Sequence, residues 1–185
     1  MNLSNFDALI LAGGKSSRFK SDKTLVPFKN SPSLTHFSFD KLKPHFNSVK
    51  ICAKEQKFSP PLPLIKDDFK GFAPIFVLAN LDEFYKNPVF VIPADMPNVS
   101  ISSIAKLFEN FINCDVNYAR TTQKEHFLCG VFDPKIAKIA REQSAKNELA
   151  IKNLLKHCSA KSTLFTKENE FLNINYQKDL QILQN

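Results

Sequence analysis

The stretch that decides the fold reads Leu9-Ile10-Leu11-Ala12-Gly13-Gly14-Lys15-Ser16-Ser17-Arg18-Phe19-Lys20-Ser21-Asp22-Lys23. Its first part belongs to an apolar run, Ala8–Ala12, that is too short for an ordinary helix and predicts a buried strand. Two adjacent glycines end this run, although the 185 residues contain only four glycines. Paired glycines let the backbone turn sharply and approach a ligand closely, because neither carries a Cβ. The stretch therefore predicts a strand followed by a tight turn.

Cations follow the two glycines directly, at Lys15, Arg18 and Lys20, and Lys23 lies just beyond them. Backbone N–H groups at a glycine turn, surrounded by positive charge, suit a polyphosphate. The alternative is a tight turn followed by a solvated basic loop, because short glycine-rich motifs have low specificity. We interpret the loop as a phosphate-binding site and keep the solvated loop as the alternative.

Two common phosphate-binding motifs do not fit this loop. A P-loop would need a glycine five positions before Gly14, where Leu9 stands. The dinucleotide fingerprint G-x-G-x-x-G would need glycines where Lys15 and Arg18 stand. The chain is therefore neither a P-loop NTPase nor a standard dinucleotide-binding protein.

Length, cysteine usage and charge narrow the class of protein. A chain of 185 residues suits one domain, which we expect to span residues 1–185. The four cysteines form no C-x-x-C motif and no zinc-site pattern. The net charge of +7 comes mostly from dispersed lysines, without an arginine-rich helix or an aromatic-interleaved basic patch. We therefore expect anionic small molecules as ligands, and no nucleic acid as a partner.

The N-terminus, Met1–Asp7, lacks the basic and apolar regions of a signal peptide, and no apolar run is long enough to span a bilayer. We therefore expect a cytoplasmic protein without a membrane partner.

Apolar patterning predicts strands that alternate with helices over the first two thirds of the chain. The expected strands cover residues 8–12, 49–53, 64–65, 88–92, 115–120, 127–132 and 162–165. The expected helices cover residues 33–46, 75–85, 101–111, 148–156 and 177–184, with another beginning at residue 134. Such alternation predicts an α/β fold of three layers, a mainly parallel sheet with helices on both faces.

Two carboxylates lie at the carboxyl ends of expected strands, Asp67 two residues after 64–65 and Asp95 three residues after 88–92. The carboxyl ends of parallel strands meet at one edge of a sheet, so both side chains should lie near the glycine turn. A carboxylate beside bound phosphates suits Mg²⁺, which takes one or two carboxylates plus phosphate oxygens. The alternatives are a turn-forming Asp67 and an Asp95 that caps a helix.

Two other polar side chains lie in or near expected strands. Cys52 should be a buried thiol, because free cysteine is among the most buried residue types. His126 stands at the start of a strand, and we interpret it as a surface or loop histidine rather than a ligand-binding residue.

The chain resembles the nucleotidyltransferases through the pattern L-A-G-G-x-S-x-R-x-x-x-D-K. Four further segments extend the likeness over most of the chain, and the combination resembles the molybdenum cofactor guanylyltransferases, the MobA family. The matching parts are Leu11–Lys23, Ile65–Asp67, the Gly71–Pro74 loop, Pro93–Pro97 and Phe171–Asn175, the last being similar to an F-x-N-[IV]-N-T element.

The resemblance implies a Rossmann-like fold of the nucleotide-diphospho-sugar transferase type. It implies transfer of GMP from GTP to molybdenum-molybdopterin, with release of pyrophosphate and Mg²⁺ as cofactor. It further implies transient contact with molybdenum cofactor insertion proteins or apo-molybdoenzymes.

The resemblance also assigns roles to single residues. Arg18, Lys23 and Asp95 would be catalytic, with Asp95 holding Mg²⁺, and Asn173 and Asn175 would face the molybdopterin. The GTP-binding set would be Leu11, Ala12, Gly13, Gly14, Lys15, Lys23, Asp67 and Asp95.

Four positions depart from the family pattern: Lys20, Cys52, Gly71–Ile75 and Tyr176. Two alternatives therefore stay open. The first is another nucleotidyltransferase, such as a CTP-using molybdenum cofactor cytidylyltransferase or a sugar-phosphate enzyme. The second is a non-catalytic nucleotide-binding assembly protein.

Overall fold

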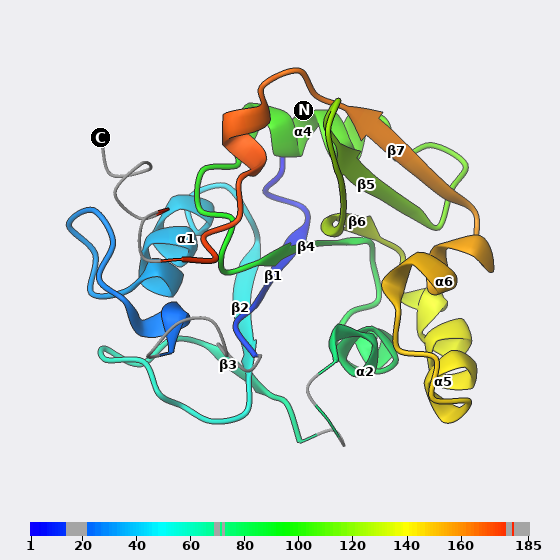
Figure 1. Ribbon diagram of the computed structural model, residues 1–185, viewed down its shortest axis with the longest axis horizontal. Coiled ribbons are helices and arrows are strands. Elements are labelled where there is room, and N and C mark those ends of the chain that lie inside the picture. Colours follow the sequence, from blue (N-terminus) through cyan, green and yellow to red (C-terminus); the bar gives the residue numbers. More distant parts are fainter. Residues whose placement is uncertain (14–21, 69–70, 72, 177–178, 180–185) are drawn as a thin grey trace.

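The structure, a computed structural model, describes residues 1–13, 22–68, 71, 73–176 and 179 (Figure 1). Within these residues the strands form one sheet in the order β3-β2-β1-β4-β6-β5-β7. The strands are β1 (Asp7–Leu11), β2 (Ser48–Ala53), β3 (Leu64–Lys66), β4 (Val89–Pro93), β5 (Val116–Arg120), β6 (Glu125–Phe132) and β7 (Ala160–Leu164).

Most neighbouring strands run in the same direction. β1 is parallel to β2 and β4, β2 is parallel to β3, and β5 is parallel to β7. β6 runs antiparallel to both β4 and β5. A short turn between β5 and β6 permits that reversal, because antiparallel neighbours need no crossover. The prediction of a mainly parallel sheet is confirmed, with β6 as the strand that reverses.

Helices connect the strands, and a serine caps the N-terminus of two of them. The Ser33 and Ser100 hydroxyls accept from the backbone N–H groups of His36 and Ser103. The α-helices are α1 (Leu34–Leu42), α2 (Pro74–Leu78), α3 (Leu81–Phe84), α4 (Ile101–Glu109), α5 (Ala137–Ala145) and α6 (Ile151–Lys156). The 3-10 helices of the described chain are η1 (Lys23–Leu25), η2 (Pro134–Ile136) and η3 (Glu168–Phe171).

The sheet separates two hydrophobic cores, as the alternation of β1 shows. Ala8 and Ile10 pack in the core that α1 and α4 cover, whereas Leu9 packs in the core that α2, α3, α5 and α6 cover. β4 alternates in the same way, and Figure 1 shows α1 well apart from the group formed by α2, α5 and α6. The predicted three-layer arrangement is therefore confirmed.

Several helices are shorter than the sequence predicts. α1 ends at Leu42, α6 begins at Ile151, and Asn80 divides the predicted helix over 75–85 into α2 and α3. The Asn80 backbone leaves the helical region (φ −118°, ψ 14°), and its side-chain amide donates to the Phe76 carbonyl at 2.8 Å. An asparagine that bonds the backbone in this way favours a helix end. The predicted helix over 177–184 lies outside the described residues, apart from Asp179.

The order of the strands creates a switch point beside β1. The chain builds β2 and β3 on one side of β1 and then returns to place β4 on its other side. Ligands of open α/β sheets bind at such a point, outside the carboxyl ends of the strands. The described helices reach at most nine residues, and none has the length and apolar character needed to cross a membrane.

Candidate active site

The carboxyl ends of four parallel strands form one row. Leu11 of β1 pairs with Cys52 of β2 and Pro93 of β4, and Cys52 pairs with Ile65 of β3. Backbone hydrogen bonds continue this order past the strand ends. The Ala12 N–H donates to Cys52 O at 2.9 Å, the Asp67 N–H to Ala53 O at 2.8 Å, and the Ala94 N–H to Leu11 O at 2.9 Å. The row therefore sets the glycine turn, Asp67 and Asp95 along the same edge.

Asp95 lies at the switch point and is bonded from two distant segments. Lys23 Nζ donates to Asp95 Oδ2 at 2.5 Å, and Asn173 Nδ2 donates to Asp95 Oδ1 at 3.0 Å. The Ile174 N–H donates to the Asp95 backbone carbonyl at 2.8 Å. The Asp95 side chain is 13% exposed and that of Lys23 is 23% exposed. A half-buried cation and carboxylate thus face the crevice together.

Lys23 is held in place by the short helix η1 that carries it. Asp22 caps this helix by accepting from the Thr24 N–H and hydroxyl, at 3.0 and 2.7 Å. Lys57 Nζ donates to Asp22 Oδ2 at 2.5 Å and to the Ala12 carbonyl at 3.2 Å. Burial would raise the pKa of Asp22, but the hydrogen bonds from Lys57 and Thr24 hold it below its usual value. The Asp22 carboxylate therefore links η1, through the Lys57 ammonium, to the Ala12 carbonyl at the end of β1.

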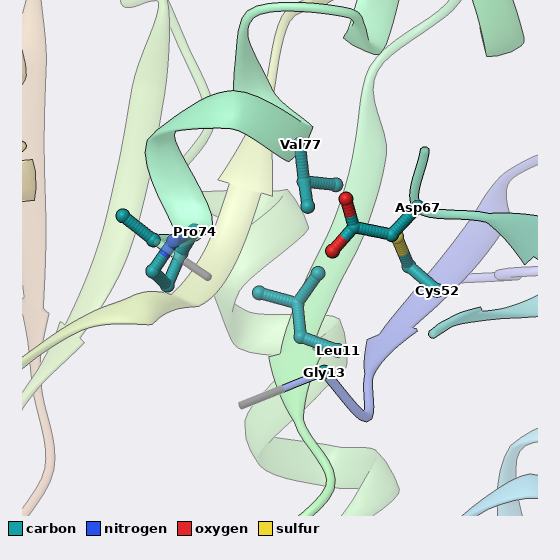
Figure 2. Close-up of a pocket in the computed structure, with 7 residues that line it drawn as sticks. Leu11, Gly13, Cys52, Asp67, Pro74 and Val77 are labelled. Atoms are coloured by element: carbon teal, nitrogen blue, oxygen red, sulfur yellow. The ribbon is translucent and has the colours of Figure 1, made fainter. Parts of the chain in front are cut away.

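A small pocket lies beside Asp67, between the ends of β1, β2 and β3 and the helix α2. Figure 2 shows the Asp67 carboxylate directed into the space between Leu11 and Val77. Lys54 Nζ pairs with Asp67 Oδ1 at 2.9 Å. Gly13 borders this carboxylate, since a Cβ built on it would lie in van der Waals contact with Asp67 Oδ2, at 3.4 Å. The pocket combines a buried carboxylate with apolar walls.

Cys52 also lines this pocket and is almost completely buried. Burial, followed by the charge of Asp67, raises the pKa of the Cys52 thiol to about 12. The thiol is therefore neutral at physiological pH, and the prediction of a buried cysteine is confirmed.

A family model for the MobA-like NTP transferase domain matches residues 8–162, which include the whole row of strand ends. The chain belongs to the MobA-like NTP transferase family. A molybdenum cofactor guanylyltransferase from Campylobacter jejuni strain RM1221 is 34% identical, over 98% of this chain and 96% of that protein. A protein of the same name from Helicobacter pylori strain J99 is 32% identical, over 97% of this chain and 88% of its own length.

The fold of this MobA-like NTP transferase also recurs in solved structures. The crystal structure of molybdopterin-guanine dinucleotide biosynthesis protein A from Archaeoglobus fulgidus superposes with a TM-score of 0.78. The alignment covers 97% of each chain at 21% identity, so this likeness shows the fold alone. The resemblance to the MobA family and its fold type is confirmed.

The structure brings together many of the residues that the sequence selects in this MobA-like NTP transferase. Asn173 contacts Asp95 directly, whereas the Asn175 N–H donates to Asp179 Oδ2 at 2.8 Å. The selected residues along the row of strand ends are Leu11, Ala12, Gly13, Lys23, Asp67 and Asp95. Gly14, Lys15 and Arg18 lie outside the described residues.

Sequence reasoning misses three lysines at this site. Lys54 pairs with Asp67, Lys57 joins Asp22 to Ala12, and Lys124 Nζ donates to Asn173 Oδ1 at 3.3 Å. Lys54 and Lys57 follow the end of β2, so the strand-end rule that selects Asp67 and Asp95 would also have found them. The sequence gives no comparable signal for Lys124, because its contact is made across a long separation in the chain.

The interpretation of His126 as a surface or loop residue is wrong. β6 begins at Glu125, and strand alternation directs His126 inward, where it is 8% exposed. The ring of Phe171 covers it at a centroid distance of 5.5 Å. Burial, followed by the charge of Lys124, lowers the pKa of His126 below its usual value. His126 is therefore a neutral side chain packed beneath the C-terminal segment.

Proposed function

We propose that this protein transfers GMP from GTP to molybdenum-molybdopterin and releases pyrophosphate, forming the guanine dinucleotide cofactor. The observation that carries the proposal is the arrangement at the switch point. Lys23, Asp95 and Asn173 meet beside the glycine turn, and the Asp67 pocket opens further along the same row. One end of the row suits a base and the other suits phosphates.

The Asp67 pocket is the proposed site for guanine. An ionised carboxylate only accepts hydrogen bonds. Guanine presents its N1–H and 2-amino donors side by side, whereas cytosine places an acceptor next to its donor. The apolar walls formed by Leu11 and Val77 would enclose the faces of the ring. The chemistry of the pocket therefore favours guanine over cytosine.

The phosphates of GTP would extend from this pocket toward Lys23 and Asp95. Ala12 and Gly13 bring the backbone to that position, and Gly14, Lys15 and Arg18 continue the family signature. Nucleotidyl transfer depends mainly on positioning and on neutralising the charge that develops on the leaving pyrophosphate. Lys23 and Arg18 are the proposed sources of that positive charge.

Asp95 is the proposed ligand of Mg²⁺, since nucleotidyltransferases generally use a divalent cation. Among the described residues, no group of three His, Cys, Asp or Glu side chains could hold a metal alone. The single carboxylate of Asp95 fits Mg²⁺, which is often held by one carboxylate together with substrate phosphates. When bound, the ion would neutralise phosphate charge. The Lys23 ammonium donates to Asp95 Oδ2 in this structure. The phosphate oxygens of a bound nucleotide would give it an alternative acceptor.

In the proposed reaction, a phosphate oxygen of the acceptor attacks the α-phosphorus of GTP. The bond to the β-phosphate breaks, and pyrophosphate leaves with the electron pair. The second pKa of a phosphate monoester is about 6, so the attacking group is already anionic and needs no general base. Transient delivery of the product to insertion proteins or apo-molybdoenzymes, in the cytoplasm, completes the proposal.

The test is release of pyrophosphate from each nucleoside triphosphate with Mg²⁺, in the presence and absence of molybdenum cofactor. We expect release with GTP only when the cofactor is present. Release with CTP instead would identify a cytidylyltransferase. Binding of GTP without release under both conditions would identify a non-catalytic assembly protein and contradict the proposal.

A further inference from the structure

A second lysine lies close to Asp95, on the side opposite Lys23. Lys124 Nζ donates to Asn173 Oδ1 at 3.3 Å, and Asn173 Nδ2 donates to Asp95 Oδ1 at 3.0 Å. Lys23 occupies the other carboxylate oxygen of Asp95. The Asn173 amide and the Asp95 carboxylate therefore separate two cations. Lys23 follows the glycine turn, and the proposed function assigns it to the phosphates of GTP. Lys124 is therefore available for a different anion.

The backbone of Lys124 is fixed while its side chain stays exposed. In the turn between β5 and β6, the Thr121 N–H donates to Lys124 O at 2.8 Å, and the Lys124 N–H donates to Thr121 Oγ1 at 3.2 Å. Within the described chain, the ammonium contacts the neutral amide of Asn173 and makes no ion pair with a carboxylate. An exposed ammonium of this kind can bind a phosphate without first breaking an ion pair.

A hollow of about 410 Å³ opens next to Lys124, within the range of small-molecule sites. Its polar lining includes Lys124, Lys152 and Asn173, together with Glu125, whose carboxylate accepts from the Tyr118 hydroxyl. Its walls are mainly apolar and come from the end of β4, from β6 and from the start of α6. They include Pro93, Met96, Phe127, Leu128 and Ile151. Apolar walls beside two lysines suit an organic ring system that carries a phosphate.

We propose that Lys124 binds the phosphate of the acceptor, and that this hollow receives the acceptor's ring system. The inference rests on the proposed function and adds a substrate-binding residue that neither the sequence pattern nor the family likeness supplies. As the acceptor oxygen forms its bond to the α-phosphorus, the bond to the departing pyrophosphate breaks. The positive charge of Lys124 lowers the repulsion between two anions that must approach each other.

The test is a pair of substitutions measured against both substrates. Lys124→Met removes the charge, and Ala150→Trp fills the hollow from an exposed position on its wall. The matched control is Lys86→Met, which lies just before β4 at the opposite edge of the sheet. Acceptor binding is measured without GTP, by the fluorescence of phosphorylated molybdopterin, and the KM for GTP is measured by pyrophosphate release.

We expect both test variants to raise the acceptor Kd about tenfold or more, with the GTP KM changed less than about twofold. Lys124→Arg should restore binding, and Lys86→Met should leave it unchanged. An unchanged acceptor Kd in either folded variant overturns the inference, as does an equal loss of affinity for GTP. Ala150→Trp keeps the test decisive if Lys124→Met fails to fold.

The result separates this inference from the proposed function. If the unmodified chain releases pyrophosphate but Lys124→Met binds the acceptor normally, the inference alone fails. If the unmodified chain releases none, the proposed function fails. If the phosphorylated pterin still bound in a way that depends on Lys124, the hollow next to Lys124 would remain assigned as its binding site.

Discussion

Asp67 and Asp95 both follow parallel strands, but their surroundings are built in different ways. The cation on Asp67 is Lys54, which comes from the end of the neighbouring strand, 13 residues away in the chain. The cation and the amide on Asp95 are Lys23 and Asn173, which are 72 and 78 residues away. The ion pair on Asp67 is thus made between the ends of neighbouring strands. The contacts on Asp95 are assembled from segments that must first be folded into place.

The C-terminal segment, which carries Asn173 to Asp95, is held in place by aromatic and apolar contacts. After β7 the chain runs back toward β4 and α1, as Figure 1 shows. Phe171 is buried against Phe165 at a centroid distance of 4.7 Å. Ile174 packs with Phe28 and Leu34 next to the η1 region. These contacts hold Asn173 against Asp95, so loosening the segment should disturb the reaction more than the choice of base.

The largest expected effect follows from Asp95→Asn. The substitution keeps the shape of the side chain but removes the charge that pairs with Lys23 and the proposed Mg²⁺ ligand. We expect a loss of turnover of about a hundredfold to a thousandfold, the range seen when one oriented electrostatic group is removed. Pyrophosphate release measures it. Thermal unfolding close to that of the unmodified chain checks the fold, and normal turnover would overturn the role of Asp95.

Asp67→Asn tests the other end of the row. The amide replaces one acceptor with a donor, which would face the N–H donors of guanine. We expect the preference for GTP over ITP, in kcat/KM, to fall about tenfold, which corresponds to about 1.4 kcal/mol. Turnover at saturating nucleotide should change less than in Asp95→Asn. An unchanged ratio would show that the base is recognised elsewhere.

Phe171→Leu loosens the C-terminal segment, and Phe132→Leu is its matched control on the opposite face of the sheet. Both phenylalanines are almost completely buried, so each substitution should destabilise the fold by about 1–2 kcal/mol. Phe171→Leu should also reduce turnover severalfold while leaving the nucleotide preference intact. Equal turnover in the two variants, measured well below their Tm, would contradict the special role of the segment.

The smallest expected effect concerns Glu170, whose carboxylate joins the C-terminal segment to the start of α4. It accepts from the hydroxyls of Ser103 and Ser100 at 2.7 and 2.9 Å. Burial would raise the pKa of Glu170, but these hydrogen bonds hold it below its usual value. A pKa lowered by folding adds stability above the unfolded pKa, and this stability is lost as pH falls through the folded pKa.

Glu170→Gln should therefore lower the Tm slightly at neutral pH and flatten its decline in acid. The measurement is the Tm of both proteins from neutral pH to about pH 3. Curves that stay parallel through the acid range would show that Glu170 contributes nothing to this dependence.

The sequence predicts the row of strand ends well because each strand is a short apolar run that ends close to a glycine turn or a charged residue. That pattern places Asp67 and Asp95 correctly along one edge. Asn80 divides a predicted helix, and the apolar periodicity of residues 75–85 does not reveal it. The reversal of β6 is also missed, because alternation is the same in parallel and antiparallel strands.

Contacts made across long separations are the part that the sequence could not supply. His126 is buried because Phe171 covers it, and Lys124 reaches the site because Asn173 lies beside Asp95. Neither contact leaves a periodic signal. The resemblance to a known family places Asn173 toward the molybdopterin, and the structure adds its hydrogen bond to the Asp95 carboxylate.

The most direct test of the central claim is a crystal structure of the chain with GTP and Mg²⁺. We expect the guanine in the pocket of Asp67 and Cys52, and the α-phosphate beside Lys23 and Asp95. The acceptor hollow next to Lys124 should stay open. A base bound away from Asp67, or phosphates directed away from Asp95, would contradict the division of the site into a recognition end and a reactive end.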